Sequence, residues 1–384
     1  MSADRAKIAF CLIGDSDIRP FNLSPRDRLR RSLARAGVAI ELSPADLETW
    51  DGAAVVLRAD YVMDDGLVAA LATSAGIALR SAGGHIVAAH GADRAGARKA
   101  FEVVAELEDV ATSDFVVQDP ITLASTYNKS LRKRAKPILV HVDRADRRAV
   151  ERLLFDGSYK GVTDLVTKYV WPLPALAVTR WCARRGVTPN MVTWVSAACV
   201  VLATVLFWHG WFVAGLAAAW TMCFLDTVDG KLARCTLTST KLGDVFDHGI
   251  DLLHPPFWYY AWFAGLGTAL AVPLSWALWV VILGYVAGRL QEGLFIWRFG
   301  IEIHTWRPLD SWFRLITARR NPNLLILSVA ALMRAPDTGL ALVAWWTILS
   351  FVFHCIRIAQ AYLAELKGQP PRSWLQTPLE SEAA

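Results

Sequence analysis

The 384-residue sequence lacks the cysteine patterns of a zinc-binding or disulfide-stabilised protein. Its six cysteines are scattered, and none forms a CxxC pair or a framework spacing, so we expect reduced thiols. A secretory signal peptide is also missing, because the apolar run near the N-terminus, "IAFCLIG", is short and leads directly into acidic residues. The N-terminal part is therefore expected to stay in the cytoplasm.

A strong charge of one sign is missing as well. The 40 Lys and Arg residues nearly balance the 35 Asp and Glu residues, and no stripe of basic and aromatic residues is present. We therefore expect no nucleic-acid partner. Apolar residues, in contrast, make up 54% of the chain; their runs are short up to about residue 160 and reach membrane-spanning length from about Met191 onward. This uneven spread predicts a soluble part followed by a membrane part.

The first part alternates short apolar runs with amphipathic stretches. "KIAFCLIG", "AAVVLRADYV" and "IALRSA" are typical of buried strands, and the stretches after them are typical of helices. The first helix is expected to be capped by Ser24, to begin at Pro25 and to stop at Gly37. Such alternation predicts a soluble α/β domain over residues 1–125.

Residues 126–186 are expected to link this domain to the membrane part. The stretch "KSLRKRAK" is typical either of a solvated helix face or of a contact with anionic lipid headgroups. The next stretch, "VTDLVTKYVWPLPALAVTRWCARRG", has the mixture of apolar residues and cations of a helix that lies on a membrane surface. A membrane domain over residues 187–365 and a C-terminal tail over residues 366–384 complete the expected organisation.

Six α-helical membrane spans are expected, each approaching the roughly 20 residues that a bilayer core requires. They are placed near residues 191–209, 211–229, 253–275, 277–296, 322–336 and 339–361. The fifth has a short apolar run, "LLILSVAALM", and the count of six depends on it.

The distribution of cations predicts the orientation of these spans. The linker after the fourth span carries Arg298, Arg307, Arg314, Arg319 and Arg320. The linkers assigned to the outside carry only Arg334. Because cations concentrate on the cytoplasmic side, we expect a multi-pass protein of a bacterial-type inner or cell membrane, with its N-terminal domain and the linker between spans two and three in the cytoplasm.

The stretch "DTVDGKLARCTLTSTKLGDVFDHGID", residues 226–251, places four acids between apolar spans. Asp226 and Asp229 are three residues apart and Asp247 and Asp251 are four apart, so each pair shares one face of a helix. Two antiparallel helices would direct all four carboxylates into one pocket. Like charges this close require cations between them, and carboxylate oxygens suit Mg²⁺ or Mn²⁺.

The residues around the acids fit a phosphate ligand. Gly230, Ala233 and Gly243 leave room for a nucleotide to approach the backbone. Arg234 offers a planar set of donors to phosphate oxygens. Two metal ions that bridge a diphosphate would stabilise charge on a phosphoryl group in transfer.

The complete pattern, DxxDGxxARx(8)GxxxDxxxD, resembles the signature of the CDP-alcohol phosphotransferases, which are integral membrane enzymes of phospholipid synthesis. All eight fixed positions match: Asp226, Asp229, Gly230, Ala233, Arg234, Gly243, Asp247 and Asp251. The resemblance covers roughly residues 160–365, and "VTPNMVT" at residues 187–193 is similar to the entry into the family's first span.

The resemblance implies transfer of a phosphoalcohol (phosphatidyl-type) group from a CDP-activated donor to an alcohol acceptor, with release of CMP. It implies that Asp226, Asp229, Asp247 and, at least partly, Asp251 hold two Mg²⁺ or Mn²⁺ ions, and that Asp251 is the general base for the attacking hydroxyl. It also implies a homodimer in contact with membrane lipids. The alternative, in which these acids only pair with arginines or cap helices, does not explain the glycines or the fixed spacing.

Several charged residues outside the signature have more than one interpretation. Arg319 and Arg320 either anchor the fifth span on the inner side or bind an anionic acceptor such as a sugar or polyol phosphate, as arginines do in the inositol-phosphate branch of the family. Arg289 and Glu292 lie inside the fourth span and are expected to pair with each other. The identities of donor and acceptor stay open.

The N-terminal domain resembles the nucleotidyltransferase half of bifunctional inositol-phosphate enzymes. It departs from that pattern because its first loop has one glycine, Gly14, and carries Asp15 and Asp17 where phosphates need amide donors. We therefore expect a degenerate domain. Two alternatives remain open: a bifunctional enzyme that also makes its CDP-alcohol from CTP, and a catalytically inactive scaffold or transporter.

Overall fold

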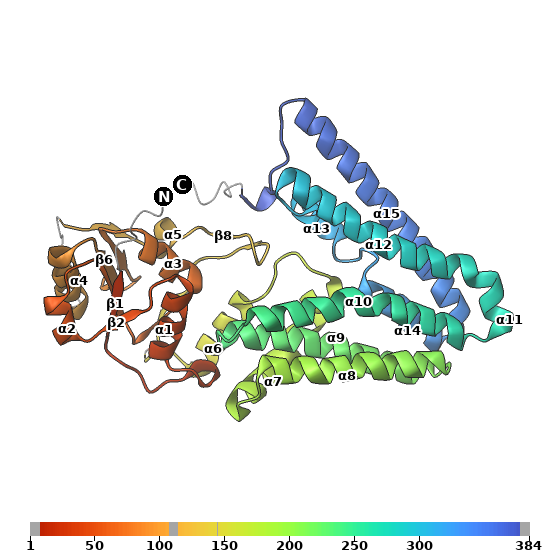
Figure 1. The fold of residues 1–384 in the computed structure, drawn as a ribbon, viewed down its shortest axis with the longest axis horizontal. Coiled ribbons are helices and arrows are strands. Elements are labelled where there is room, and N and C mark those ends of the chain that lie inside the picture. Colours follow the sequence, from red (N-terminus) through yellow and green to blue (C-terminus); the bar gives the residue numbers. More distant parts are fainter. Residues whose placement is uncertain (1–7, 107–113, 144, 377–384) are drawn as a thin grey trace. The chain divides into compact units, whose positions relative to one another are not determined.

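The computed structural model describes residues 8–106, 114–143 and 145–376, and within these it describes the side chains at all positions except Lys241, Leu242, Asp244, Asp247 and His248. The chain divides into two compact units. The first comprises residues 1–128, 134–159 and 234–237, and the second comprises residues 129–133, 160–233 and 238–384. The strands belong mainly to the first unit, and the long helices belong to the second (Figure 1).

The first unit contains a six-stranded sheet in the order β2-β1-β3-β6-β5-β7. Its strands are β1 (Ala9–Ile13), β2 (Ile40–Leu42), β3 (Ala54–Arg58), β5 (Ile77–Arg80), β6 (Ile86–Gly91) and β7 (Val116–Gln118). β1 is parallel to β2 and β3, whereas β6 runs antiparallel to β3 and β5. The three strands expected from the sequence are confirmed, but β6 was not predicted, since its run "IVAAHG" is short and rich in alanine.

Helices cover both faces of this sheet. They are α1 (Pro25–Arg35), α2 (Pro44–Thr49), α3 (Asp65–Thr73), α4 (Arg94–Glu106) and α5 (Pro120–Leu123), whereas α6 (Arg147–Gly157) packs through Val150 on Val62 and Val142. Phe10 and Leu12 of β1 pack with Leu29 of α1, while Cys11 packs with Ala97 of α4. Successive strand residues thus point to opposite apolar layers, and the expected α/β region is confirmed.

The first helix follows the sequence signals closely. The Ser24 side chain accepts a hydrogen bond from the Asp27 backbone N–H, and Pro25 is the first helical residue. Gly37, just after the helix, has a φ of +87°, a conformation that glycine adopts without strain. Four further strands are short and form two pairs. β4 (Tyr61–Met63) pairs with β10 (Leu139–His141), and β8 (Tyr127–Asn128) pairs with β9 (Lys133–Arg134).

The second unit is helical. Its helices are α7 (Pro172–Arg185), α8 (Pro189–Trp208), α9 (Phe212–Cys235), α10 (Lys241–Gly265), α11 (Thr268–Ala271), α12 (Ser275–Phe299), α13 (Pro308–Phe313), α14 (Arg320–Leu332) and α15 (Pro336–Leu366). α8 packs on α10, and α15 packs on both α12 and α14 (Figure 1).

In the part of the chain that the structure describes, four helical segments are long and apolar enough to cross a membrane. They are α8, α9, Thr268–Phe299 and α15. The predicted count of six is not confirmed by this measure. α14 has only 13 residues, in line with the short apolar run of the fifth predicted span. α10 has 25 residues, but its first turns carry acids and it contains Pro255 and Pro256.

Glycine permits a close crossing of α8 and α10. A Cβ atom on Gly265 would lie 2.0 Å from the carbonyl oxygen of Phe207, which is far inside van der Waals contact. The backbones of the two helices therefore meet directly at this point, at the end of the bundle away from the acids.

Gly265→Ala should lower the thermal midpoint of the protein in detergent, because an added methyl group forces α8 and α10 apart at a cost of about 1–3 kcal/mol. Gly293→Ala in α12 is the matched control, since no atom lies within 4 Å of its added Cβ and alanine favours a helix over glycine by about 1 kcal/mol. Thermal unfolding of both variants checks this, and equal midpoints would contradict the direct crossing.

Candidate active site

The acids of the signature lie on two helices of the second unit. Asp226 and Asp229 are near the end of α9, and Asp247 and Asp251 are in the first half of α10. Asp226 and Asp251 come together at Arg320, the first residue of α14. The Arg320 guanidinium donates to Asp226 Oδ2 over 2.5 Å and makes a second ion pair with Asp251 Oδ1. Acids from two different helices therefore share one arginine side chain.

Asp229 is buried more deeply, with 3% of its surface exposed. Its Oδ2 accepts a hydrogen bond of 2.8 Å from the Thr193 hydroxyl on α8. Its Oδ1 is buried and has no hydrogen-bond partner among the described residues. A carboxylate oxygen without water or a partner is costly, and this atom is therefore a natural ligand for a cation.

The fourth acid, Asp247, is on α10 one turn before Asp251, but its side chain lies outside the described residues. Among the described side chains, no group of three or more His, Cys, Asp or Glu residues is arranged to hold a metal ion. The set of four carboxylate ligands therefore stays a prediction, of which the structure brings Asp226 and Asp251 together.

The small residues of the signature lie on the same two helices. Gly230, Ala233 and Arg234 follow Asp229 on α9, and Gly243 is in the first turn of α10. A Cβ atom on Gly243 would lie 2.8 Å from Asn190 Oδ1. This glycine consequently admits the Asn190 side chain from the start of α8, a packing role that the sequence did not reveal.

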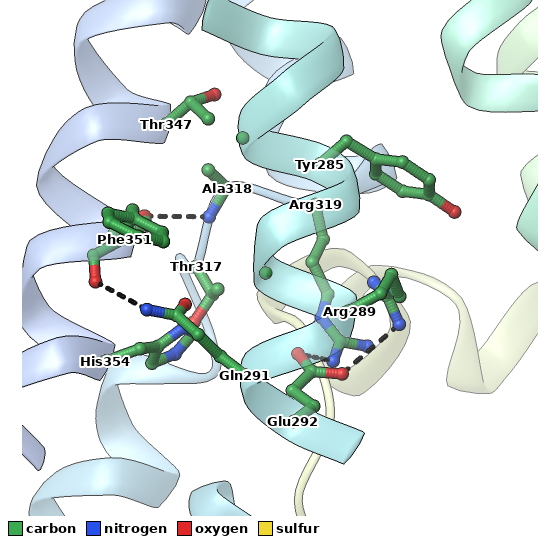
Figure 2. Close-up of a pocket in the computed structure, with 13 residues that line it drawn as sticks. Tyr285, Arg289, Gln291, Glu292, Thr317, Ala318, Arg319, Thr347, Phe351 and His354 are labelled. Atoms are coloured by element: carbon green, nitrogen blue, oxygen red, sulfur yellow. Dashed lines mark hydrogen bonds and ion pairs between the residues drawn. The ribbon is translucent and has the colours of Figure 1, made fainter. Parts of the chain in front are cut away.

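A second group of charges surrounds Glu292 on α12 (Figure 2). Arg289 pairs with Glu292 over 3.3 Å, as predicted, and Arg319 makes a further ion pair with the same carboxylate. His304 Nε2 lies 3.3 Å from Glu292 Oε1. Burial lowers the pKa of His304 well below its usual 6.5 despite this hydrogen bond, so the ring is neutral and the positive charges near Glu292 are the two arginines.

The Glu292 group lines a pocket between α12, α15 and residues 317–319 (Figure 2). Two buried polar atoms of its lining, Gln291 Oε1 and His354 Nε2, have no hydrogen-bond partner among the described residues. The pocket is thus polar although two apolar helices build it. It lies beside the acids, because Tyr285 of the lining donates to the backbone oxygen of Leu252 next to Asp251.

The start of α14 joins these groups to the rest of the unit. Asn321 donates to Asp164 Oδ1 over 3.0 Å, and Asn323 donates to the Tyr259 hydroxyl of α10 over 2.8 Å. Burial raises the pKa of Asp164, but the nearby charge of Arg314 and its hydrogen bonds outweigh that effect and lower it overall. The segment "ARRNPN" therefore contacts α9, α10 and α12 through consecutive polar side chains.

Sequence reasoning found the acids and both arginines but missed Thr193, Asn321 and Asn323. Each is a polar residue next to an apolar run, which is the one signal available for them, because burial of such a side chain requires a hydrogen-bond partner. The partner itself is far away in the sequence and does not follow from spacing.

Comparison with known proteins finds similarity to one family in the helical unit. Residues 186–353 match the family model described as CDP-alcohol phosphatidyltransferase. The match covers less than half of the 384-residue chain, so it shows the family that the helical unit is similar to. The match includes every residue of the signature, which agrees with the resemblance drawn from the sequence.

Curated relatives are similar over part of their length. Ethanolaminephosphotransferase 1 of Pongo abelii is 36% identical over 107 residues, 24% of this chain and 25% of that protein. Cholinephosphotransferase 1 of Xenopus laevis is 28% identical, covering 38% of this chain and 40% of that protein. Phosphatidylinositol phosphate synthase of Cutibacterium acnes is 30% identical, covering 26% of this chain and 46% of that protein. The chain thus spans about a quarter of the ethanolaminephosphotransferases it matches.

Among solved structures, the phosphatidylinositol phosphate synthase of Mycobacterium tuberculosis is 20% identical with a TM-score of 0.37, covering 47% of this chain and 94% of that chain. The same protein has been solved with CDP-DAG bound and in complex with manganese and citrate. The resemblance of residues 1–125 to nucleotidyltransferases is not confirmed by these comparisons, and the matches do not favour the bifunctional, transporter or scaffold alternatives.

Arg320→Gln should destabilise the metal-free protein, because Asp226 and Asp251 lose their shared cation. Breaking a buried ion pair lowers the free energy of unfolding by roughly 3–5 kcal/mol. We expect a loss near or below the low end of that range, since 39% of the Asp251 side chain is exposed. Added Mn²⁺ should restore more stability in this variant than in the wild type. The measurement is the thermal midpoint with and without Mn²⁺, and Arg184→Gln, at an exposed position of α7, is the control. An unchanged metal-free midpoint would contradict the bridging role.

Proposed function

We propose that this chain is a membrane transferase of phospholipid biosynthesis that moves a phosphoalcohol group from a CDP-activated donor to an alcohol acceptor and releases CMP. The observation that carries the proposal is the convergence of Asp226 and Asp251, acids of the region that matches the family, on the partly buried guanidinium of Arg320. The names of the relatives, which include ethanolamine- and cholinephosphotransferases, point to the same class of reaction.

Two divalent cations, Mg²⁺ or Mn²⁺, are part of this proposal. The residues that would hold them are Asp226, Asp229, Asp247 and Asp251. These four carboxylates fit such ions, because carboxylate oxygens are the ligands that hard cations prefer. In addition, Asp229 Oδ1 is buried without a partner among the described residues. When bound, the ions would neutralise the donor diphosphate and polarise its phosphoryl group.

Among the acids whose side chains the structure describes, Asp251 is the best placed to act as general base. Its side chain is 39% exposed, compared with 16% for Asp226, so an acceptor hydroxyl can reach it. The hydroxyl oxygen forms a bond to the β-phosphorus of the donor while Asp251 takes its proton. The bond from the β-phosphorus to the bridging oxygen breaks, and CMP leaves with that electron pair.

Nucleotide binding is proposed for the small residues and the arginine of the signature. Gly230 and Ala233 have little or no side chain, so a nucleotide could approach the α9 backbone next to the acids. Arg234 would donate hydrogen bonds to phosphate oxygens of the CDP-activated substrate. Gly243 would contribute on α10, where it already accommodates Asn190.

Binding of an anionic acceptor by Arg319 and Arg320 is also part of the proposal, but both arginines are already paired with carboxylates. Arg319 is paired with Glu292, and Arg320 is paired with Asp226 and Asp251. An anionic acceptor would therefore bind by exchanging with these carboxylates, most readily at Arg320 once cations occupy the acids. An uncharged lipid hydroxyl would need no such exchange.

The remaining assignments concern topology and assembly. We propose six spans, with α10 and α14 added to the four long apolar segments, and a cytoplasmic location for the acids and the N-terminal domain. The arginines between α12 and α14 support this orientation by the positive-inside tendency. We also propose a homodimer in the bilayer, and the division into residues 1–125, 126–186, 187–365 and 366–384.

Purified protein in detergent should release CMP from a CDP-alcohol only when Mg²⁺ or Mn²⁺ and an acceptor are present. Asp251→Asn should lower the rate by about 10²–10⁴-fold, the usual contribution of a general base, whereas Asp337→Asn at the start of α15 should not. Labelled CDP-diacylglycerol or CDP-ethanolamine with a panel of alcohols, and products identified by mass, would name both substrates. Metal-independent CMP release, or full activity of Asp251→Asn, would contradict the proposal.

A further inference from the structure

We propose that Thr193 is a positioning residue for Asp229, which orients this carboxylate so that one oxygen is reserved for a divalent cation. The inference rests on the proposed function, which makes Asp229 a metal ligand. Thr193 is on α8 and Asp229 is on α9, and their contact joins Oγ1 to Oδ2 over 2.8 Å. Both residues are buried, with 6% and 3% of their surfaces exposed.

The hydroxyl proton of Thr193 has two acceptors within reach. The carbonyl oxygen of Pro189 is 3.1 Å away, whereas Oδ2 of Asp229 is 2.8 Å away. We assign the proton to Asp229 because this contact is the shorter of the two. This bond occupies Oδ2 and leaves Oδ1 without a partner among the described residues.

Other threonines of the bundle show that this contact is unusual. Thr204, Thr221 and Thr227 donate to the backbone oxygen four residues earlier in their own helices, at 2.8–3.2 Å. Such bonds satisfy the hydroxyl without any partner on another helix. Thr193 has the same local option and nevertheless lies against a carboxylate of the signature.

The helix that carries Thr193 is attached to both acid-bearing helices. One turn later, Ser196 lies 3.4 Å from the backbone oxygen of Met222 on α9. Three residues earlier, Asn190 lies against Gly243 on α10. α8 contains no acid, but it can therefore set the position of Asp229 relative to the acids of α10. Partners that orient metal ligands in this way typically change metal affinity about 10–100-fold when they are removed.

Thr193→Val removes the hydroxyl at nearly constant volume, and Thr193→Ser keeps it. Thr204→Val on the same helix is the matched control, because its hydroxyl bonds only within α8. Mn²⁺ binding is measured by electron paramagnetic resonance and by the Mn²⁺-dependent rise of the thermal midpoint, both of which are independent of turnover. The rate of CMP release as a function of Mn²⁺ concentration is measured in parallel.

Thr193→Val should bind Mn²⁺ about 10–100-fold more weakly, while Thr193→Ser and Thr204→Val should bind it as the wild type does. If Thr193→Val does not fold, Thr193→Ala serves as the second variant without a hydroxyl. Wild-type Mn²⁺ affinity in the variant lacking the hydroxyl would overturn the positioning role. A wild type that binds Mn²⁺ but releases no CMP would instead refute the proposed function, and a wild type that binds no Mn²⁺ would refute both.

Discussion

The ion pairs of Arg320 with Asp226 and Asp251 are the interaction on which the site depends. Carboxylates between apolar helices are costly, because neither lipid nor packed side chains replace their hydration. A single guanidinium shared by two acids from different helices reduces that cost and also fixes the distance between the helices. It holds the acids together in the absence of metal, so that the proposed site for divalent cations would not have to assemble from repelling charges.

The same solution is repeated one helix away. Glu292 is neutralised by Arg289 and Arg319, and His304 completes its hydrogen bonds. Since Arg319 and Arg320 are adjacent, a short stretch at the start of α14 balances the acids of α9, α10 and α12. The start of this short helix thus has a clear structural purpose, because it brings two arginines to the acids at the centre of the unit.

Local features of the sequence predicted much of this structure. The cap at Ser24, the left-handed Gly37 and the Arg289–Glu292 pair each depend on residues within one or two turns, and all three are found. The similarity to the family was predicted from the fixed spacing of the signature. β6 was missed because its six residues, "IVAAHG", show no distinctive period of apolar and polar residues.

Contacts between distant segments could not be predicted. Thr193 and Asp229 are 36 residues apart, and Arg320 and Asp226 are 94 apart. Their pairing depends on how α8, α9 and α14 cross, which is decided by packing at points such as Gly215 of α9 against the Phe207 ring of α8. The count of spans was equally uncertain, because the hydropathy of α14 does not reveal whether a short helix crosses or only enters the bilayer.

The central claim is that acids of α9 and α10 form one cation site next to Arg320. The most direct measurement is the anomalous scattering of Mn²⁺ in a crystal of the full chain. The account predicts Mn²⁺ within ligand distance of Asp226, Asp229 and Asp251, with the Arg320 guanidinium displaced from at least one of its two acids. Mn²⁺ bound elsewhere, with both ion pairs of Arg320 intact, would contradict it.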